Sequence, residues 1–448
     1  MRLYQRKNHV TVLAALLLSL SACGGRRHIV QYTPVLPAAG AGSVTAGSSK
    51  DVAVQDTAGS GCGGTLEHKE LTVVQADSLS WLGHVQLRLD SLCHSSLNET
   101  SQLGIYIYDL TDGQPVYAKN ARHRMRPASC EKLVTCITLL DKVDGCQPLS
   151  TEVRATGHLD DNVLEGDIYL AGDMDPMLSR ADLDSLACAL HRGGVDSIAG
   201  RVCELMPPYE VLPYGWGWCW DDDYGPLAAH LVDGAEGIHT AWVEALMKSG
   251  IRLQCTSVAE VNLQEGEVIA AYSLGHTIAE IMDPLLKKSD NIYAECLFHR
   301  LASMGACRKT ARHQAAAVVD SLITRLGLIP EDYLIADGSG LSLYNYVTPE
   351  LLVTLLNHAY RTESIRQTLW PCLPIAGVDG TLTCRMKGTI AQGNVRAKTG
   401  TVEGVSSLSG YLTAANGHLF SFSIINQGVA KTKHGQNFQD AVCLLLCQ

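Results

Sequence analysis

The sequence lacks any excess of positive charge. Its 35 lysine and arginine residues are outnumbered by 46 aspartate and glutamate residues, which gives a formal net charge of −11 at pH 7. Nucleic acids and anionic membrane surfaces are bound by concentrated lysine and arginine. The composition therefore argues against nucleic acid as a partner. Beyond its first residues the chain also lacks an apolar run long enough to form a transmembrane helix.

The cysteine pattern excludes two classes of protein. The 16 cysteines include no C-x-x-C pair, and no Cys/His set has zinc-finger spacing. They also do not form the dense framework of a small disulfide-stapled fold. In an apolar helical stretch, cysteine usually acts as a small buried hydrophobe. We assign this role to Cys136, Cys188, Cys296 and Cys443.

Residues 1–22 have the features of an export signal. A basic segment precedes an apolar stretch at 12–18, which is too short to span a bilayer permanently. The sequence LSAC at 20–23 resembles the lipobox of bacterial lipoproteins, in which the chain is cut before the cysteine and the cysteine is lipidated. We predict a signal peptide at 1–22, lipidation of Cys23 and an exported, membrane-anchored protein that faces the bacterial periplasm. The alternative is an ordinary secretory signal with a chance cysteine, which also takes the protein out of the cytoplasm.

Composition divides the rest of the chain into a linker and a folded part. Residues 23–66 are rich in Ala, Gly, Ser and Thr and contain few large apolar residues, which is typical of a flexible tether. The folded part is too long for one ordinary domain, so we expect a large domain with an accessory lobe. We assign 67–150 and 270–448 to the large domain and 151–269 to an inserted accessory region.

Strand signals come from both ends of the folded part. Residues 103–110 have the composition of a strand, and 404–413 and 418–427 are strand-like runs joined around Asn416-Gly417. Asn-Gly is a strong hairpin signal because both residues tolerate positive φ. Apolar residues recur at helical spacing after Ser129. We therefore predict an α/β protein of the α+β type, with an antiparallel sheet packed between helices.

The first candidate for chemistry is S-x-x-K, formed by Ser129 and Lys132 at the start of a predicted helix. Residues three apart lie on one helix face, so the lysine amine can lie beside the serine hydroxyl. A lysine whose pKa is lowered by burial and nearby cations can activate that hydroxyl as a nucleophile. By itself the motif is weak, since a serine helix cap followed by a surface lysine has the same pattern.

Two further motifs follow in the chain. Ser289-Asp290-Asn291 precedes a helical run, and Ser289 could relay a proton while the Asn291 amide binds a substrate carbonyl. Alone, this motif could also be a helix cap. Lys398-Thr399-Gly400-Thr401 lies on a predicted strand, where a lysine and a hydroxyl suit a substrate carboxylate and the glycine allows close approach of another chain. Alone, it could also be a turn.

Together the three motifs carry far more information than each one does. S-x-x-K, S-D-N and K-T-G form the catalytic set of penicillin-binding proteins and class A β-lactamases. Their surroundings, PASCEKLVT at 127–135, DGSGLS at 337–342, GVDGTL at 377–382 and AKTGT at 397–401, narrow the choice. From about residue 103 to the C-terminus the chain resembles the D-alanyl-D-alanine carboxypeptidase/endopeptidase family of low-molecular-weight penicillin-binding proteins.

The resemblance implies a β-lactamase/transpeptidase-like domain and a reaction without metal or organic cofactor. Ser129 would attack the carbonyl between two D-alanines of a peptidoglycan peptide, with Lys132 as general base. Ser289 would relay a proton to the leaving amine. The partners implied are peptidoglycan peptides, β-lactam inhibitors and, through Cys23, a membrane. The substrate-binding residues implied are Asn291, Lys398, Thr399, Gly400 and Thr401, with the backbone N–H groups of Ser129 and Thr401 as the oxyanion hole.

Two features depart from the family pattern. The inserted accessory region is shorter than is usual, so we expect a reduced lobe. Leu343 stands where the family often has arginine. Two rival functions stay open at this point: a β-lactamase, which shares the three motifs, and a catalytically silent lipoprotein that binds the cell wall. The intact Ser129, Lys132 and Lys398 argue against the silent protein.

Overall fold

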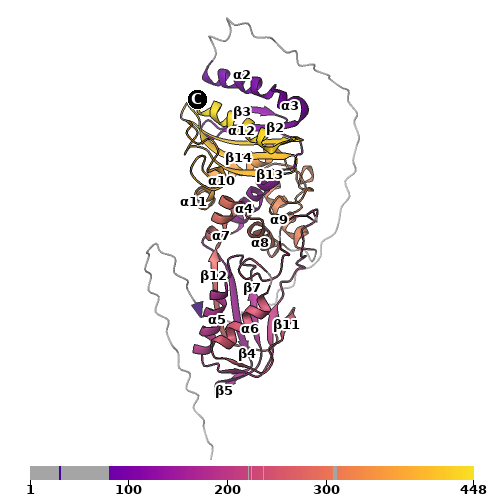
Figure 1. Ribbon diagram of the computed structural model, residues 1–448, viewed down its shortest axis with the longest axis vertical. Coiled ribbons are helices and arrows are strands. Elements are labelled where there is room, and N and C mark those ends of the chain that lie inside the picture. Colours follow the sequence, from indigo (N-terminus) through magenta and orange to yellow (C-terminus); the bar gives the residue numbers. More distant parts are fainter. Residues whose placement is uncertain (1–29, 32–79, 220, 223–224, 236, 306–309) are drawn as a thin grey trace, which may run out of the picture.

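The computed structural model describes residues 30–31 and 80–448, except 220, 223–224, 236 and 306–309 (Figure 1). The predicted signal peptide 1–22, the lipidated Cys23 and nearly all of the tether 23–66 lie outside the described residues and stay predictions. Val30–Gln31 (β1) pairs antiparallel with a strand of the accessory lobe. No helix in the described part of the chain is long and apolar enough to cross a membrane.

A five-stranded antiparallel sheet forms one end of the molecule (Figure 1). Its order is β13-β14-β15-β2-β3, so strands from both ends of the chain lie side by side, as predicted. The hairpin around Asn416-Gly417 is confirmed, because Gly417 has a φ of 82° between two paired strands. The strands are β2 (Gln102–Asp109), β3 (Gln114–Lys119), β13 (Arg396–Val402), β14 (Val405–Thr413) and β15 (Leu419–Gln427).

Helices cover both faces of this sheet, which is why β14 is buried along almost its whole length. On β15, Phe420, Phe422 and Ile424 point to one face because side chains alternate along a strand. They pack there against α2 (Trp81–Cys93) and α12 (Thr432–Cys447). The predicted sheet between helices is therefore confirmed.

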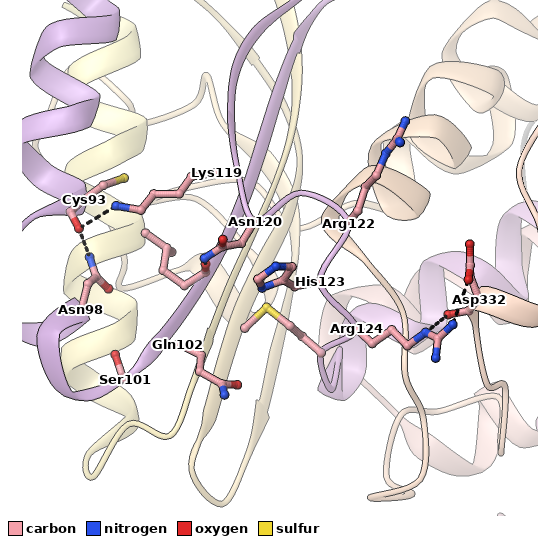
Figure 2. Close-up of a pocket in the computed structure, with 12 residues that line it drawn as sticks. Cys93, Asn98, Ser101, Gln102, Lys119, Asn120, Arg122, His123, Arg124 and Asp332 are labelled. Atoms are coloured by element: carbon pink, nitrogen blue, oxygen red, sulfur yellow. Dashed lines mark hydrogen bonds and ion pairs between the residues drawn. The ribbon is translucent and has the colours of Figure 1, made fainter. Parts of the chain in front are cut away.

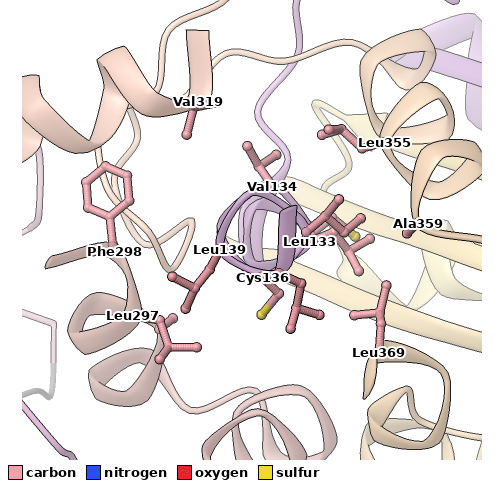
Figure 3. Packing of buried hydrophobic residues seen from close by; sticks show 14 of the residues in the cluster. Leu133, Val134, Cys136, Leu139, Leu297, Phe298, Val319, Leu355, Ala359 and Leu369 are labelled. Atoms are coloured by element: carbon pink, nitrogen blue, oxygen red, sulfur yellow. The ribbon is translucent and has the colours of Figure 1, made fainter. Parts of the chain in front are cut away.

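The opposite face packs against a group of helices centred on α4 (Glu131–Lys142) (Figure 3). Ten of the residues of α4 are buried, so this helix lies in the core rather than on the surface. Leu297, Phe298, Val319, Leu355 and Leu369 surround it. They come from its neighbours α8 (Asn291–Ala302), α9 (Ala311–Arg325), α10 (Pro349–Arg361) and α11 (Glu363–Cys372), and α7 (Ile278–Lys288) completes the group.

The accessory lobe lies at the other end of the molecule, beyond these helices (Figure 1). Its main sheet has the order β1-β12-β4-β7-β9-β11, and α5 (Arg180–Arg192) and α6 (Ile238–Lys248) pack on one face to form a separate core. The strands are β4 (Pro148–Thr156), β7 (Ile168–Gly172), β9 (Val202–Leu205), β11 (Val258–Val261) and β12 (Val268–Thr277). A smaller sheet contains β5 (His158–Asp160), β6 (Val163–Glu165), β8 (Ser197–Ile198) and β10 (Arg252–Leu253).

The predicted limits of the insertion, 151 and 269, fall inside β4 and β12. These two strands pair with each other and lead into and out of the lobe. The structure therefore places the lobe between Pro148 and Thr277. That the lobe is an independent, reduced domain remains a proposal.

All thirteen cysteines that the structure describes are free. Burial of Cys136, Cys296 and Cys443 is confirmed, but the prediction for Cys188 was wrong, since that side chain is exposed. Cys188 lies on α5, whose inward face is formed by Leu183, Leu186 and Leu190. Helical spacing places residue 188 outside that stripe.

Candidate active site

Ser129 lies in a single 3-10 turn, η1 (Ala128–Cys130), that leads directly into α4. Ala128 has a φ of 47°, in the left-handed region that residues with a side chain seldom adopt. The loop around Gly340 packs against it, and a Cβ at Gly340 would lie 1.9 Å from the Ala128 carbonyl oxygen. Gly340 also has a φ of 80°, so both space and backbone conformation require glycine at this position.

Lys132 lies one helical turn after Ser129 and is fully buried. Its Nζ donates to Ser129 Oγ at 2.9 Å, to Asn291 Oδ1 at 2.5 Å and to the Ser339 carbonyl oxygen at 2.7 Å. Three acceptors thus satisfy the three donors of an ammonium group. Burial lowers the pKa of Lys132 to about 8, although the carboxylates of Asp337 and Glu295 favour the charged form. An amine with this pKa can accept the proton of the serine hydroxyl near neutral pH.

Lys398, on β13, is the second fully buried lysine of the site. Its Nζ donates to Ser289 Oγ at 2.9 Å and to the Thr399 carbonyl oxygen at 2.7 Å. Burial and, to a smaller extent, the nearby charge of Lys132 lower the pKa of Lys398 to about 7. Each lysine therefore contacts one serine hydroxyl.

The S-D-N motif forms the corner between α7 and α8. Ser289 ends α7 with a φ of 63°, which is unusual for a residue other than glycine. Asp290 caps α8 by accepting a hydrogen bond from the Tyr293 N–H at 3.1 Å. The helix-cap alternative thus holds for Asp290 alone. Its two neighbours, Ser289 and Asn291, point instead to the two lysines.

Strand β13 lies tightly against the turn that carries Ser129. A Cβ at Gly400 would lie 2.2 Å from Ser407 Oγ and 2.6 Å from the Pro127 carbonyl oxygen. Only glycine allows this approach within the chain. The expected approach of another chain at Gly400 stays a prediction. Cys130 is fully buried beside the nucleophile, and its Sγ donates to the Lys398 carbonyl oxygen at 3.3 Å. Burial raises the pKa of the Cys130 thiol, so this residue packs rather than reacts.

A groove of about 370 Å³ gives access to these groups. Five of the predicted site residues line it: Ser129, Ser289, Asn291, Thr399 and Thr401. Lys132 and Lys398 lie buried and hydrogen-bonded to the two serines of this lining. Further lining comes from Lys288, Gly340, Leu341, Thr381, Arg385, Val402 and Gln436.

A larger cavity of about 750 Å³ lies elsewhere, beside α2, β2 and β3 (Figure 2). Its lining includes Lys119, Arg122, His123 and Arg124, but none of the predicted site residues. Arg124 is paired with Asp332 at 2.8 Å across this cavity. The three motifs therefore meet in the smaller groove.

The buried acidic surroundings of Lys132 include residues that sequence reasoning missed. Glu295 Oε1 accepts hydrogen bonds from the Gly338 N–H at 3.1 Å and the Ser339 N–H at 2.8 Å. These bonds hold the Ser339 carbonyl that accepts from Lys132. A signal was available, because Glu295 follows Asn291 by four residues and therefore shares its helix face.

Asp337, which the resemblance had singled out, anchors the same loop. It accepts from the Gly340 N–H at 2.8 Å, the Ser342 N–H at 2.6 Å and the Asn345 side-chain amide at 2.6 Å. Trp218 Nε1 donates to it at 2.9 Å. With its oxygens so fully used, the carboxylate holds the loop over Ser129 and needs no role in the chemistry.

Glu131 was also missed. It lies between Ser129 and Lys132 and is fully buried, and neither of its carboxyl oxygens has a hydrogen-bond partner among the described residues. Burial, with the charges of Asp337 and Glu295, raises the pKa of Glu131 well above its ordinary value. This shift favours the protonated, uncharged form of the carboxyl.

A basic side chain lies next to Leu343, the position where the family often has arginine. Arg126 Nε donates to the Leu343 carbonyl oxygen at 2.9 Å, and the guanidinium lies 6.0 Å from the centre of the Tyr346 ring. A cationic group thus lies beside position 343, although it comes from the segment before Ser129.

Comparison with known proteins places this site in a family. The chain is 28% identical over 439 residues to the D-alanyl-D-alanine carboxypeptidase of Actinomadura sp. strain R39, covering 76% of this chain and 80% of that protein. It is 23% identical to the D-alanyl-D-alanine carboxypeptidase DacB of Haemophilus influenzae, covering 73% of this chain and 85% of the relative.

Solved structures agree on the fold. Penicillin binding protein 4 (dacB) of Haemophilus influenzae superposes with a TM-score of 0.69 at 23% identity, covering 79% of this chain and 97% of the other. A predatory endopeptidase from Bdellovibrio bacteriovorus, solved with its immunity protein, gives a TM-score of 0.51 at 16% identity and covers 75% and 90%. The predicted transpeptidase-like fold is therefore confirmed.

Family membership follows from the sequence match itself. The profile of the D-Ala-D-Ala carboxypeptidase 3 (S13) family matches residues 85–234 and 223–448, two segments that overlap and include all three motifs. The resemblance that the motifs predicted is confirmed, and the chain belongs to the D-Ala-D-Ala carboxypeptidase 3 (S13) family.

Proposed function

We propose that this protein is a serine-type D-alanyl-D-alanine carboxypeptidase/endopeptidase that cleaves peptidoglycan peptides through an acyl-enzyme on Ser129. The contact that carries the proposal is the hydrogen bond between the buried Lys132 amine and Ser129 Oγ at 2.9 Å. A binding module has no need of a base with a lowered pKa beside a serine that lines a groove. Family membership supplies the substrate class.

The reaction begins when neutral Lys132 accepts the proton of Ser129. The freed Oγ attacks the carbonyl carbon between two D-alanines, or of a peptide cross-link, and an oxyanion forms. The backbone N–H groups of Ser129 and Thr401 stabilise that oxyanion, and loss of one such donor typically costs about 10²–10³ in rate. The C–N bond then breaks, and the leaving amine takes its proton through Ser289. Water releases the acyl group and regenerates the serine.

Substrate binding uses the other residues of the groove. Lys398 and Thr399 hold the terminal carboxylate, whose negative charge favours the protonated form of Lys398. Thr399 Oγ1 donates to Thr381 Oγ1 at 2.8 Å, which orients its hydroxyl. Asn291, held by Lys132, presents its amide to a substrate carbonyl. Gly400 keeps β13 close to Ser129. β-Lactams would inhibit by acylating the same serine.

Labelled penicillin tests the nucleophile. We expect Ser129→Ala to abolish labelling while circular dichroism and thermal unfolding remain those of a folded protein. Cys130→Ala is the matched control and should keep its label, because Cys130 only packs. Labelling of Ser129→Ala would exclude Ser129, and absence of labelling in the wild type would favour a silent cell-wall-binding lipoprotein.

Two substrates distinguish carboxypeptidase activity from endopeptidase activity. A pentapeptide stem reports carboxypeptidase activity as released D-alanine, and a cross-linked dimer reports endopeptidase activity as released monomer, both read by mass. Rapid turnover of penicillin, in place of stable acylation, would favour the β-lactamase alternative.

The location of the enzyme is a further part of the proposal. We propose export to the periplasm and attachment through a lipid on Cys23, as the lipobox at 20–23 indicates. The membrane-bound protein should carry the mass of an acylated N-terminal cysteine. A mature N-terminus at another residue, without lipid, would contradict this.

A further inference from the structure

Two glutamates lie side by side at the edge of the main sheet of the accessory lobe, whose edge strand β11 is labelled in Figure 1. Glu204 on β9 and Glu260 on β11 are direct neighbours in the parallel pairing of these strands. Their side chains therefore share one face of the sheet. Like charges in this arrangement destabilise a sheet unless something compensates for them.

Helix α6 brings a histidine to the same place. Val202, two residues before Glu204, shares a core with Ile238 and Trp242 of α6, so this face of β9 points to that helix. His239, in the first turn of α6, is hydrogen-bonded through Nε2 to Glu204 Oε2. Ligand atoms of Glu204, His239 and Glu260 all lie within 4.8 Å of one another.

A second histidine supports the cluster from behind. His230 is only 3% exposed, and its Nδ1 donates to Glu204 Oε1 at 2.7 Å. Its Nε2 is buried and has no hydrogen-bond partner among the described residues. His230 thus orients Glu204, as partners behind a metal ligand do.

Glu260 is exposed and has no hydrogen-bond or ion-pair partner among the described residues. The cluster therefore opens to solvent on the side of Glu260.

We propose that Glu204, His239 and Glu260 form a binding site for a divalent transition metal ion, with zinc as the best match. Imidazole nitrogen and carboxylate oxygen are both zinc ligands, and zinc sites with three protein ligands keep water in the fourth position. The ion would tie α6 and the edge strand β11 to β9. It is separate from the proposed peptidase reaction, which requires no metal.

Another acidic cluster provides an internal control. Asp109, Asp112 and His418 also approach one another at the hairpin between β2 and β3. There, Asp109 Oδ1 accepts the Thr111 N–H at 2.9 Å and the Asp112 N–H at 3.1 Å, so the turn accounts for this carboxylate. No partner of Glu204 is a backbone group of this kind among its described contacts.

The test uses the whole folded protein after treatment with a chelator. Titration with ZnCl₂ in a calorimeter should show one ion per chain, and zinc should raise Tm. His239→Gln and Glu260→Gln should each weaken binding at least about tenfold and remove the rise in Tm. Both side chains are at the surface, and penicillin labelling verifies that the variants fold. Asp112→Asn should bind zinc as the wild type does.

Cobalt(II) identifies the ligands, because free cysteines also bind zinc. Bound cobalt should give visible d–d bands without the near-ultraviolet thiolate band. Unchanged zinc affinity in both variants, loss of binding in Asp112→Asn, or a thiolate band that accounts for the bound ion would each overturn the inference.

Discussion

At the scale of single residues, two buried lysines and the serines they contact dominate the site. Burial lowers the pKa of Lys132 to about 8 and that of Lys398 to about 7, because an ammonium group loses its hydration in the interior. Protonation of one also disfavours protonation of the other. Both amines therefore titrate near neutral pH, and a substrate carboxylate bound at Lys398 would favour the charge there while Lys132 acts as the base.

Acylation should increase with pH up to about 8. Lys132 accepts a proton only as the free amine, and its pKa is lowered to about 8 by burial. The second-order rate of penicillin acylation should therefore rise about tenfold per pH unit well below that value and level off above it. Stopped-flow measurement between pH 5.5 and 9.5 would check this. A rate that does not change over this range would exclude Lys132 as the base.

Replacement of the base gives a second measure. Lys132→Arg keeps a positive charge but cannot lose it near neutral pH, so acylation should fall by about 10²–10⁴. Lys287→Arg is the matched control. Lys287 forms an ion pair with Asp379 at 2.6 Å, and arginine keeps the positive charge of that pair, so this variant should acylate as the wild type does. Equal acylation by Lys132→Arg and wild type would contradict the assignment.

Glu131 should make stability dependent on pH. Its pKa is raised in the folded protein by burial, so above the ordinary carboxyl pKa the unfolded chain loses a proton that the folded chain keeps. Glu131 therefore does not reduce the free energy of unfolding of the wild type below about pH 4. As pH rises above that value, the free energy of unfolding decreases. Glu131→Gln carries no such proton, so its free energy of unfolding relative to wild type should increase from pH 4 to pH 8. Denaturant unfolding at several pH values would check this, and a constant difference would contradict it.

At the scale of elements, the site depends on close contact between three segments. The turn of Ser129 is held between strand β13 and the loop around Gly340, and Gly400 and Gly340 are the points of closest approach. The left-handed backbone of Ala128 persists because these neighbours leave the turn no alternative. Local sequence alone would not favour this conformation.

Gly340→Ala should damage the site more than the addition of one methyl group would suggest. Its Cβ would collide with the Ala128 carbonyl oxygen, 1.9 Å away, and the φ of 80° would be strained. We expect a loss of about 2–5 kcal/mol in the free energy of unfolding, from strain and overpacking together, and a large drop in acylation rate. Gly388→Ala is the matched control: Gly388 has a φ of 73° but no atom within 4 Å of the new Cβ. It should lose about 1 kcal/mol and acylate normally. Similar effects of the two variants would contradict the collision.

At the scale of the whole molecule, two cores lie on either side of the central helices. The lobe core contains Trp242, Leu186 and Val202, and it shares no member with the cores around α4 and the five-stranded sheet. This separation supports the proposal that the lobe is a domain of its own.

Hydrogen exchange would test the separation. Trp242→Ala removes a side chain that is 1% exposed and should cost about 3–5 kcal/mol. If the lobe unfolds independently, amides of β4, β7 and β9 should lose protection while those of β14 and β15 keep theirs. Phe422→Ala, in the five-stranded sheet, should have the converse effect. Loss of protection throughout the molecule in both variants would show a single cooperative unit.

Much of the site could be predicted from the sequence, because each motif consists of residues that are close together in the chain. The three-residue spacing of Ser129 and Lys132 is one helical turn, and the corner at Ser289 lies between two helical runs, so pattern alone predicted their neighbourhood. The paired strands around Asn416-Gly417 were predicted for the same reason. The limits of the insertion have no such local signal, because β4 and β12, which lead into and out of the lobe, pair across the whole of it.

By itself, the sequence determined the family, the nucleophile candidate and the sheet between helices, since these rest on spacing, order and periodicity. Only the tertiary structure decided the partners that distant segments supply: Ser339 and Asn291 around Lys132, Ser289 beside Lys398, and Glu204 opposite Glu260. The physical reason is the same in each case. A pKa, a collision or a ligand set depends on which atoms lie within a few ångströms, and that is decided by packing between segments far apart in the chain.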